Sequence, residues 1–227
     1  MKIITVLVCF FSFILIAPQF AKAQDIKAER IKASYLLAYG RLPLDAELNW
    51  WKSQNDFTVS QLVETHRNYM NRTSPGSKDD VIKKTYLIAF GRDRNVQTGE
   101  INHWKGRSEV FWEMFPYHVR FLSENLRGRP DIYEDVIKNA YNMLFKKPAS
   151  ATELGKWKSL PVNSFAELIF ILYKNPPAGY NVDPSALLTA MMYYKDFSNI
   201  TFSNNVVNEI IAITGGADLY NKFKRGM

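Results

Sequence analysis

The chain has 227 residues, with 29 Lys and Arg against 22 Asp and Glu and a formal net charge of +7. Its single cysteine, Cys9, lies in an N-terminal segment that we expect to be removed, which excludes disulfides, thiol catalysis and cysteine metal sites from the rest of the chain. Loss of Lys2 and Lys22 with that segment lowers the charge from +7 to +5, a mild and dispersed charge that does not indicate a nucleic-acid partner.

Residues 1–23 have the pattern of a secretory signal peptide. Lys2 supplies a positive start, Ile3 to Ile16 is an apolar run, and Ala21-Lys22-Ala23 is a small-x-small cleavage site. An uncleaved anchor is the competing interpretation, but a run of about 14 residues is short for a bilayer core, which needs about 20. We therefore expect a mature chain starting at Gln24, exported to the periplasm or cell surface, without a transmembrane segment.

The sequence contains three copies of one short motif. In each copy an Ile stands four residues before a Tyr, a basic residue follows the Tyr by six, and a Glu precedes a Trp by four. Successive tyrosines lie 51 and 55 residues apart, a period typical of arrays of helical units. The motif residues are Tyr35, Gly40, Arg41, Glu47 and Trp51 in copy one, Tyr86, Gly91, Arg92, Glu100 and Trp104 in copy two, and Tyr141, Lys147, Glu153 and Trp157 in copy three.

Each copy begins with the periodicity of an amphipathic helix. In copy one the apolar residues fall at i, i+4, i+7 and i+8 from Ile31, which is one face of a helix, and the other copies repeat this from Ile82 and Ile137. Gly40 and Gly91 follow, where a helix can end in a left-handed turn without steric cost. Because Lys146 takes this place in copy three and a left-handed lysine is unfavourable, we expect an altered turn there.

A short second helix is predicted to begin near Asp45, Thr98 and Ser150, which are good N-cap residues. The repeated Glu then lies in the first turn, where the helix dipole favours a carboxylate, and the repeated Trp follows one turn later. We expect each Trp to pack under the first helix. Because the basic residue and the Glu recur together, we interpret the pair as a salt bridge or cap that fixes the turn rather than as a catalytic pair.

A third helix is predicted to begin near Thr58 in copy one and Ser164 in copy three. Copy two is expected to lose this register, because Ser108 arrives early and Pro116 interrupts the apolar run. Linkers rich in Pro, Gly or Ser follow each copy.

From Asp183 the pattern is lost. Asp183-Pro184 predicts a helix through Leu187 to Tyr194, and a second helix is predicted over about 204–214, before Gly215-Gly216 and a basic tail at 222–225. These helices are either a decayed fourth unit or a cap that covers the last copy. The predicted fold is all-α, with three tandem three-helix units and C-terminal capping helices: signal peptide 1–23, units 24–74, 75–129 and 130–176, and cap and basic tail 177–227.

The Tyr-x4-Gly-Arg pattern with a following Trp resembles a bacterial helical repeat of unknown function, found in secreted and surface-layer-associated proteins. Its unit looks similar to the phycobilisome linker domain. The resemblance covers about residues 26 to 174 and is weakest in copy three, where Lys147 replaces the arginine. The family form usually has a glycine near the position of the repeated Glu, so these copies depart from it there. The resemblance implies a role in assembly or surface attachment, without a known reaction.

No enzyme signature is present in the sequence. The three histidines, His66, His103 and His118, lack the spacing of a metal site, and we expect His66 to line a helix face because Leu172 stands at its place in copy three. Nucleophile-elbow and phosphate-cradling glycine motifs are absent. We predict no cofactor, no metal and no enzymatic activity. A hydrolase with an unfamiliar site would instead place Glu47, Glu100 or Glu153 in a cleft beside another carboxylate.

Two tryptophans, Trp50 and Trp112, stand outside the repeated register and are candidate contact residues, because exposed tryptophan marks binding sites. The sequence favours a non-enzymatic exported scaffold or subunit that binds protein partners in the cell envelope. The alternative is a module that binds cell-wall or other glycans through these tryptophans and basic side chains.

Overall fold

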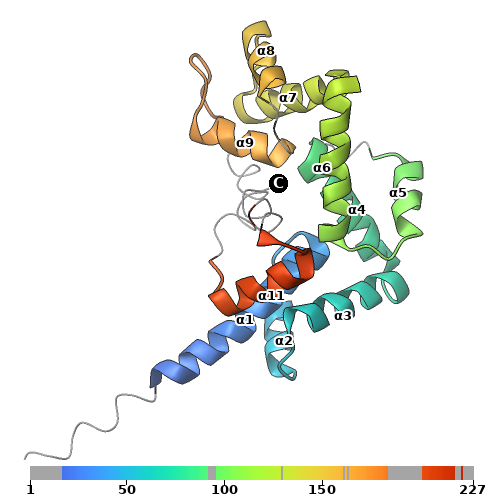
Figure 1. Cartoon of the computed structure of the whole chain (residues 1–227), viewed down its shortest axis with the longest axis vertical. Coiled ribbons are helices and arrows are strands. Elements are labelled where there is room, and N and C mark those ends of the chain that lie inside the picture. Colours follow the sequence, from blue (N-terminus) through green and yellow to red (C-terminus); the bar gives the residue numbers. More distant parts are fainter. Residues whose placement is uncertain are drawn as a thin grey trace, which may run out of the picture.

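The computed structural model describes residues 17–91, 96–128, 130–160, 162, 164–183, 201–217 and 221. All regular structure in these ranges is helical, as the sequence predicts (Figure 1). The helices are α1 (Ala17–Tyr39), α2 (Asp45–Ser53), α3 (Val59–Arg72), α4 (Pro75–Phe90), α5 (Thr98–Lys105), α6 (Phe111–Gly128), α7 (Pro130–Phe145), α8 (Ala151–Ser159), α9 (Phe165–Lys174) and α11 (Asn204–Thr214).

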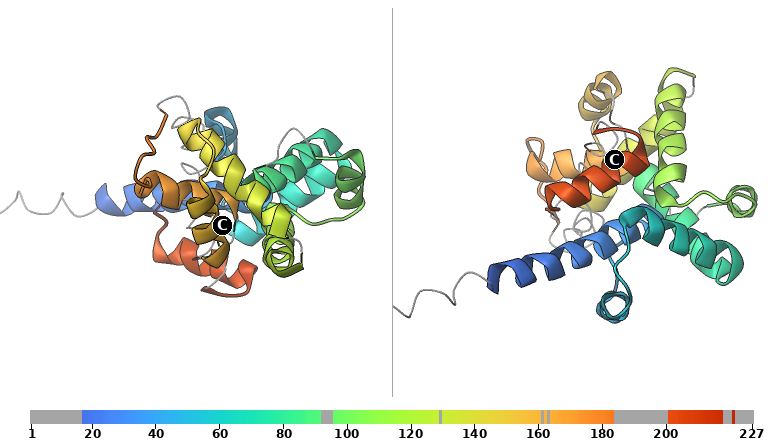
Figure 2. Two further views of the ribbon diagram at one scale, coloured as in Figure 1. Left: turned by 90° about the horizontal axis from the view of Figure 1, so that it is seen from above. Right: turned by 60° about the horizontal axis from the view of Figure 1, so that its bottom comes forward.

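Each copy of the motif corresponds to three successive helices. The long first helix packs against the third in every case, α1 on α3, α4 on α6 and α7 on α9. The short second helices α2, α5 and α8 lie at the periphery (Figures 1 and 2). Most buried apolar side chains form one continuous core that extends from Ala33 in α1 to Ile210 in α11, and a small separate cluster surrounds Trp51 under α2.

Successive helix triplets meet at the turn that ends each first helix, where α1 packs on α6 and α4 packs on α9. Gly40 has a φ of +64°, and a Cβ added there would lie 2.5 Å from the ring of Phe111. Gly91 has a φ of +68°, and its added Cβ would lie 2.7 Å from the ring of Phe165. Glycine is therefore required at both positions for two reasons, backbone conformation and close contact with the next triplet.

The expectation of an altered turn in copy three is wrong. Lys146 has a φ of +50°, so it adopts the same left-handed conformation as the two glycines. Its side chain is exposed, so it does not meet the close ring contact that an added Cβ would meet at Gly40 and Gly91. The cost of a left-handed lysine, about 1–2 kcal/mol, is small enough for the surrounding packing to offset.

The starts of two short helices differ by one residue from the prediction. Leu44 and Gln97, rather than Asp45 and Thr98, hold the N-cap positions, whereas Ser150 caps α8 as predicted. The side chains of Glu47 and Glu100 accept hydrogen bonds from the backbone N–H of Leu44 and Gln97, at 2.7 and 2.9 Å. In copies one and two the repeated Glu therefore caps the turn itself, so the N-cap side chain is free to vary there.

The third helix of copy two is not interrupted, contrary to prediction, but the predicted loss of register is present as a shift of one residue, because the helix begins seven residues after its Trp and those of copies one and three begin eight residues after theirs. It begins at Phe111, not near Ser108, and it continues through Pro116 to Gly128. A proline inside a helix costs about 3 kcal/mol. The buried side chains of Phe111, Met114, Phe115 and Leu122, which are at most 1% exposed, outweigh that cost.

The predicted C-terminal helix over 204–214 is confirmed as α11, which ends at left-handed Gly215. It packs on α1 and α3, the helices of copy one, and not where a cover for the last copy would lie (Figures 1 and 2). Polar contacts hold it there: Glu209 accepts from Arg30 at 2.8 Å and from the backbone N–H of Val59 at 2.8 Å, and Glu29 accepts from Ser203. The helix predicted through Leu187 and the basic tail lie outside the described residues.

Candidate functional site

The three repeated tryptophans are structural. Trp51, Trp104 and Trp157 are 5–8% exposed, as the sequence predicts. The indole N–H of Trp51 donates to the hydroxyl of Tyr35 at 3.2 Å, and that of Trp157 donates to Tyr141 at 3.0 Å. Trp51 and Trp157 thus each attach a short helix to the first helix of their copy.

The turn of copy one is fixed by a bidentate ion pair. Arg41 donates to the two oxygens of Glu47 at 2.7 and 2.8 Å and to the carbonyl of Leu42 at 2.9 Å. Its guanidinium also lies 5.2 Å from the ring centre of Tyr35 and 5.4 Å from that of Tyr39. Burial raises the pKa of Glu47, but the hydrogen bonds from Arg41 and from the backbone of Leu44, together with the positive charge of Arg41, outweigh it, and the pKa is lowered. Arg92, the partner predicted for Glu100, lies outside the described residues.

In copy three Tyr180 takes the place of that arginine. Its ring packs on Tyr141 and Phe145 at centre distances of 5.0 and 5.2 Å, the rings that correspond to Tyr35 and Tyr39. Its hydroxyl donates to the carbonyl of Pro148 at 3.0 Å and accepts from the N–H of Ser150 at 2.9 Å. Pro148 and Ser150 correspond to Leu42 and Leu44, so one phenol makes the turn contacts that Arg41 and Glu47 make together.

Lys147, which stands at the arginine position of copy three, binds Tyr180 instead of the repeated glutamate. Its ammonium lies 4.7 Å from the ring centre of Tyr180 and donates to the carbonyl of Gly179 at 3.2 Å. Glu153 in turn accepts a hydrogen bond from Tyr141. The predicted basic–Glu pair is therefore present as an ion pair in copy one and is replaced by other contacts in copy three.

Copies one and two each form a cleft lined by equivalent residues. Cleft one has a volume of about 530 Å³ and cleft two of about 320 Å³. In both, the repeated Tyr, Glu and Trp meet a histidine and an aromatic residue from the third helix. Cleft one is lined by Tyr35, Tyr39, Arg41, Ala46, Glu47, Trp50, Trp51, Thr65, His66, Tyr69 and Ser77. Cleft two is lined by Tyr86, Phe90, Glu100, His103, Trp104, Tyr117, His118, Arg120, Phe121 and Glu124.

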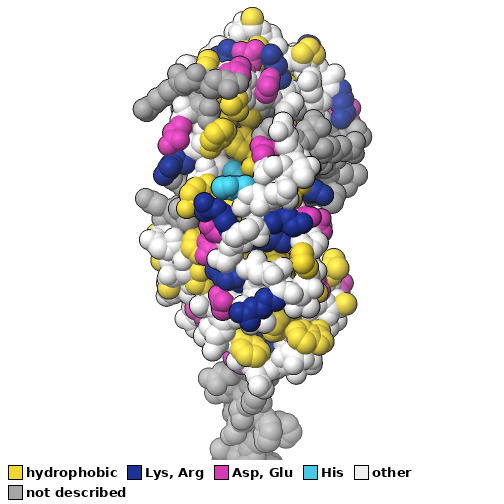
Figure 3. All heavy atoms as spheres, turned by 90° about the vertical axis from the view of Figure 1, so that its right-hand side faces the viewer, with side chains coloured by type: hydrophobic (Ala, Val, Ile, Leu, Met, Phe, Trp, Pro, Cys, Tyr) yellow, Lys and Arg dark blue, Asp and Glu magenta, His cyan; other side chains and the backbone are white. Residues whose placement is uncertain are grey.

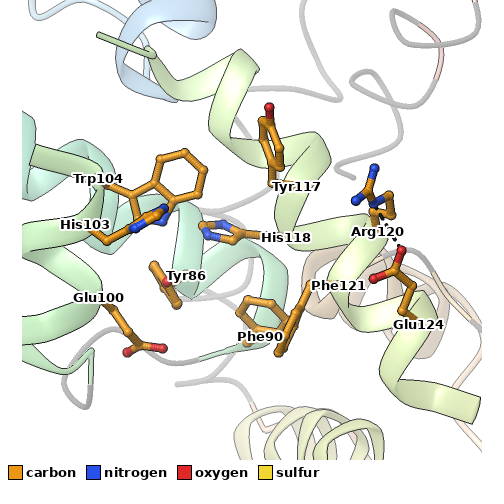
Figure 4. A pocket seen from close by; sticks show the side chains of 10 residues that line it. All are labelled: Tyr86, Phe90, Glu100, His103, Trp104, Tyr117, His118, Arg120, Phe121 and Glu124. Atoms are coloured by element: carbon orange, nitrogen blue, oxygen red, sulfur yellow. Dashed lines mark ion pairs between the residues drawn. The ribbon is translucent and has the colours of Figure 1, made fainter. Parts of the chain in front are cut away.

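A histidine ring lies at the floor of each cleft. The His66 ring packs on Tyr35 at 4.5 Å and on Tyr39 at 5.0 Å, and its Nε2 lies 3.2 Å from the hydroxyl of Ser34. Burial lowers its pKa to about 3, so the ring is neutral at neutral pH. His118 occupies the same place in cleft two, 4.3 Å from Tyr86 (Figure 4). His66 thus lines a helix face, as predicted.

Aromatic rings also form the rims of the clefts. Trp50 and Tyr69 border cleft one and are 57% and 49% exposed, whereas Tyr117 and Phe121 border cleft two and are 51% and 47% exposed. On the face shown in Figure 3, hydrophobic side chains lie above and to the left of the histidine. These four rings are the large exposed aromatic side chains among the described residues.

The two candidate contact tryptophans lie in different settings. Trp50 is exposed at the rim of cleft one. Trp112 is half-buried against the main core, and its indole N–H has no hydrogen-bond partner among the described residues. The sequence analysis named neither Tyr69 nor Phe121 as a contact residue. Both stand ten residues after the first residue of their third helix, but that equivalence was hidden because copy two was predicted to lose register.

Glu47 is paired with Arg41, and Glu153 with Tyr141, rather than with a second carboxylate. Glu100 and Glu124 both line cleft two, but they lie on opposite sides of it, and Glu124 is paired with Arg120 at 3.1 Å (Figure 4). The described residues contain no group of three His, Cys, Asp or Glu side chains able to hold a metal ion. No helix in that part of the chain is long and apolar enough to cross a membrane.

The comparisons with known proteins give no relative. Neither a family model nor a curated protein nor a solved structure matches the chain.

Proposed function

We propose that the chain is an exported, non-enzymatic array of three tandem helical units, 24–74, 75–129 and 130–176, that acts as a scaffold or subunit by binding a protein partner in the cell envelope. Equivalent contacts support the repeat organisation. The residue four before the repeated Ile reaches the loop before the third helix in every copy: Lys27 donates to Gln54, Lys78 to Glu109, and Tyr133 accepts from Val162.

The proposal of a protein partner is based on cleft two. Tyr117 and Phe121 leave about half of their surfaces in water beside a cavity whose floor is Trp104 and His118. Aromatic side chains beside a preformed pocket are the usual anchors of protein interfaces, because a partner that covers them removes a large apolar area from water. The ion pair of Arg120 and Glu124 at the edge, which is largely exposed, supplies the polar rim that such interfaces have.

A photo-crosslinking amino acid at position 117, introduced into the full chain in its native cells, tests this function. We expect one reproducible crosslinked protein, lost when Phe121→Ala is added. The matched control places the crosslinker at Thr65, the equivalent position in copy one, where the same product should be absent. Equal products from both positions, or a product that Phe121→Ala leaves unchanged, would refute cleft two as the docking surface.

Export rests on the pattern of residues 1–23 and is tested separately. We expect N-terminal sequencing of the protein from the periplasm or cell surface to begin at Gln24. A full-length chain recovered only from the cytoplasm would refute export and leave the docking proposal intact.

A further inference from the structure

The two clefts differ in chemistry at equivalent positions. On the third helix, Thr65 and Tyr69 of cleft one stand where cleft two has Tyr117 and Phe121. On the first helix, Tyr39 stands where cleft two has Phe90. Two of these three replacements add a hydroxyl group to an aromatic ring, and the third replaces a ring by a small hydroxyl side chain. Ser77 adds a further hydroxyl, so cleft one has the larger volume and more hydroxyl groups than cleft two.

The ion pair in the wall of cleft one retains unused hydrogen-bonding capacity. Arg41 directs three N–H groups to Leu42 and Glu47 and leaves its Nε–H and one Nη2 N–H unused by the described residues. Glu47 accepts three hydrogen bonds, from Arg41 and from the N–H of Leu44, out of about four that a carboxylate can accept. Both side chains are accessible, at 38% and 30% exposure. A rigid donor and a rigid acceptor thus stand side by side.

An exposed indole completes the cleft. Trp50 precedes the buried Trp51, and the two rings meet edge to face at 4.7 Å, which fixes the orientation of Trp50 although 57% of it is exposed. The equivalent residues are His103 in copy two and Lys156 in copy three, so the indole is specific to copy one. Tyr69 supplies a second exposed ring on the same cavity.

We propose that cleft one binds an uncharged oligosaccharide, independently of the protein partner at cleft two. A pyranose ring has an apolar C–H face that packs on an indole or phenol ring, and a rim of hydroxyl groups that both donate and accept. Cleft one offers Trp50 and Tyr69 for the face and Arg41 and Glu47 for the rim. Arg41 and Glu47 cancel each other's charge, which suits a neutral ligand, and about 530 Å³ is within the range of small-molecule sites, about 300–1,000 Å³.

An apolar protein side chain fits cleft one less well. It would cover the Arg41 N–H groups that no described residue uses and the hydroxyl of Tyr69 without bonding them, and a buried polar group left unpaired costs about 1–3 kcal/mol. Cleft two would not incur this cost to the same extent, because its side chains at the equivalent positions offer mainly hydrocarbon surface.

Titration of the purified chain with neutral trisaccharides tests the proposal. The probes are chitotriose, cellotriose, maltotriose and mannotriose, followed by tryptophan fluorescence and by calorimetry. We expect saturable binding of at least one of them, with an emission change from Trp50. Trp50→Ala and Glu47→Gln should each weaken that binding at least about tenfold, which corresponds to about 1.4 kcal/mol.

The repeat supplies matched controls. His103→Ala and Lys156→Ala change the equivalent positions of copies two and three, and each should leave sugar binding within about twofold of the unchanged chain. No saturable binding of any probe up to about 10 mM, or equal losses in Trp50→Ala and His103→Ala, would overturn the proposal. A circular-dichroism spectrum of each variant separates unfolding from loss of the site. A failure of sugar binding would not affect the crosslinking result at cleft two, because that experiment tests positions 117 and 121 and not Trp50 or Glu47.

Discussion

Replacing Gly40 by alanine tests how the helix triplets are joined. Two costs add at this position. A left-handed alanine costs about 1–2 kcal/mol. Its Cβ would also lie 2.5 Å from the ring of Phe111, which is 1% exposed and has little freedom to move, and such overpacking costs about 1–3 kcal/mol. We therefore expect Gly40→Ala to lower the free energy of unfolding by about 2–5 kcal/mol, a large part of the about 5–15 kcal/mol of an ordinary domain.

The chain contains a control for each cost. Gly215, at the end of α11, has a φ of +80° but nothing within 4 Å of an added Cβ, so Gly215→Ala should show the backbone cost alone. Lys146→Gly removes a left-handed side chain and should stabilise the chain by about 1 kcal/mol. Urea unfolding followed by circular dichroism measures all three. If Gly40→Ala and Gly215→Ala cost the same, Phe111 does not pack on Gly40 and the proposed junction between units is wrong.

Three further predictions follow from side-chain contacts. Tyr180→Phe removes two hydrogen bonds to the turn of copy three and should lower the unfolding free energy by about 1–3 kcal/mol in urea, whereas an unchanged value would show that the phenol does not replace the arginine. Because burial lowers the pKa of His66 from 6.5 to about 3, the unfolded chain binds the extra proton, so stability should fall by about 2 kcal/mol between about pH 7 and 5. His66→Leu, which copies Leu172, should reduce that dependence in thermal melts, and an unaltered pH profile would show that His66 is not buried. Glu209→Ala uncaps α3 at Val59, and hydrogen exchange there should accelerate about tenfold or more, while exchange in α9 stays constant.

The sequence predicts most of the local structure because local signals determine it. The ends of the first helices, the burial of Trp51, Trp104 and Trp157 and the extent of α11 were all predicted from periodicity, glycines and N-cap residues. The start of the third helix in copy two was missed because the step from Trp to that helix is seven residues there, from Trp104 to Phe111, and eight in copy one, from Trp51 to Val59. Glu113, whose carboxylate accepts from the N–H of Val110 at 2.9 Å, marks the true start.

Non-local contacts could not be predicted in the same way. Tyr180 comes from an irregular segment, and its place on the turn of copy three depends on tertiary packing, 33 residues after Lys147. The position of α11 on copy one depends on Arg30 and Glu209, which are 179 residues apart. The clefts follow from the repeat only once the third helices are aligned, because each draws a histidine and a rim ring from that helix.

One described end of the proposed array is covered by a helix and the other is polar, which bears on how the array binds partners. At one end α11 packs on α1 and α3, as a preceding unit would. At the other end, copy three has exposed polar residues where the first two copies have apolar or small ones: Asn142 corresponds to Leu36 and Leu87, and Lys146 corresponds to Gly40 and Gly91, which contact the next triplet. A further copy stacked on that end would bury an asparagine and a lysine without partners, which is unfavourable. Partners are therefore expected along the sides of the array, where the clefts open.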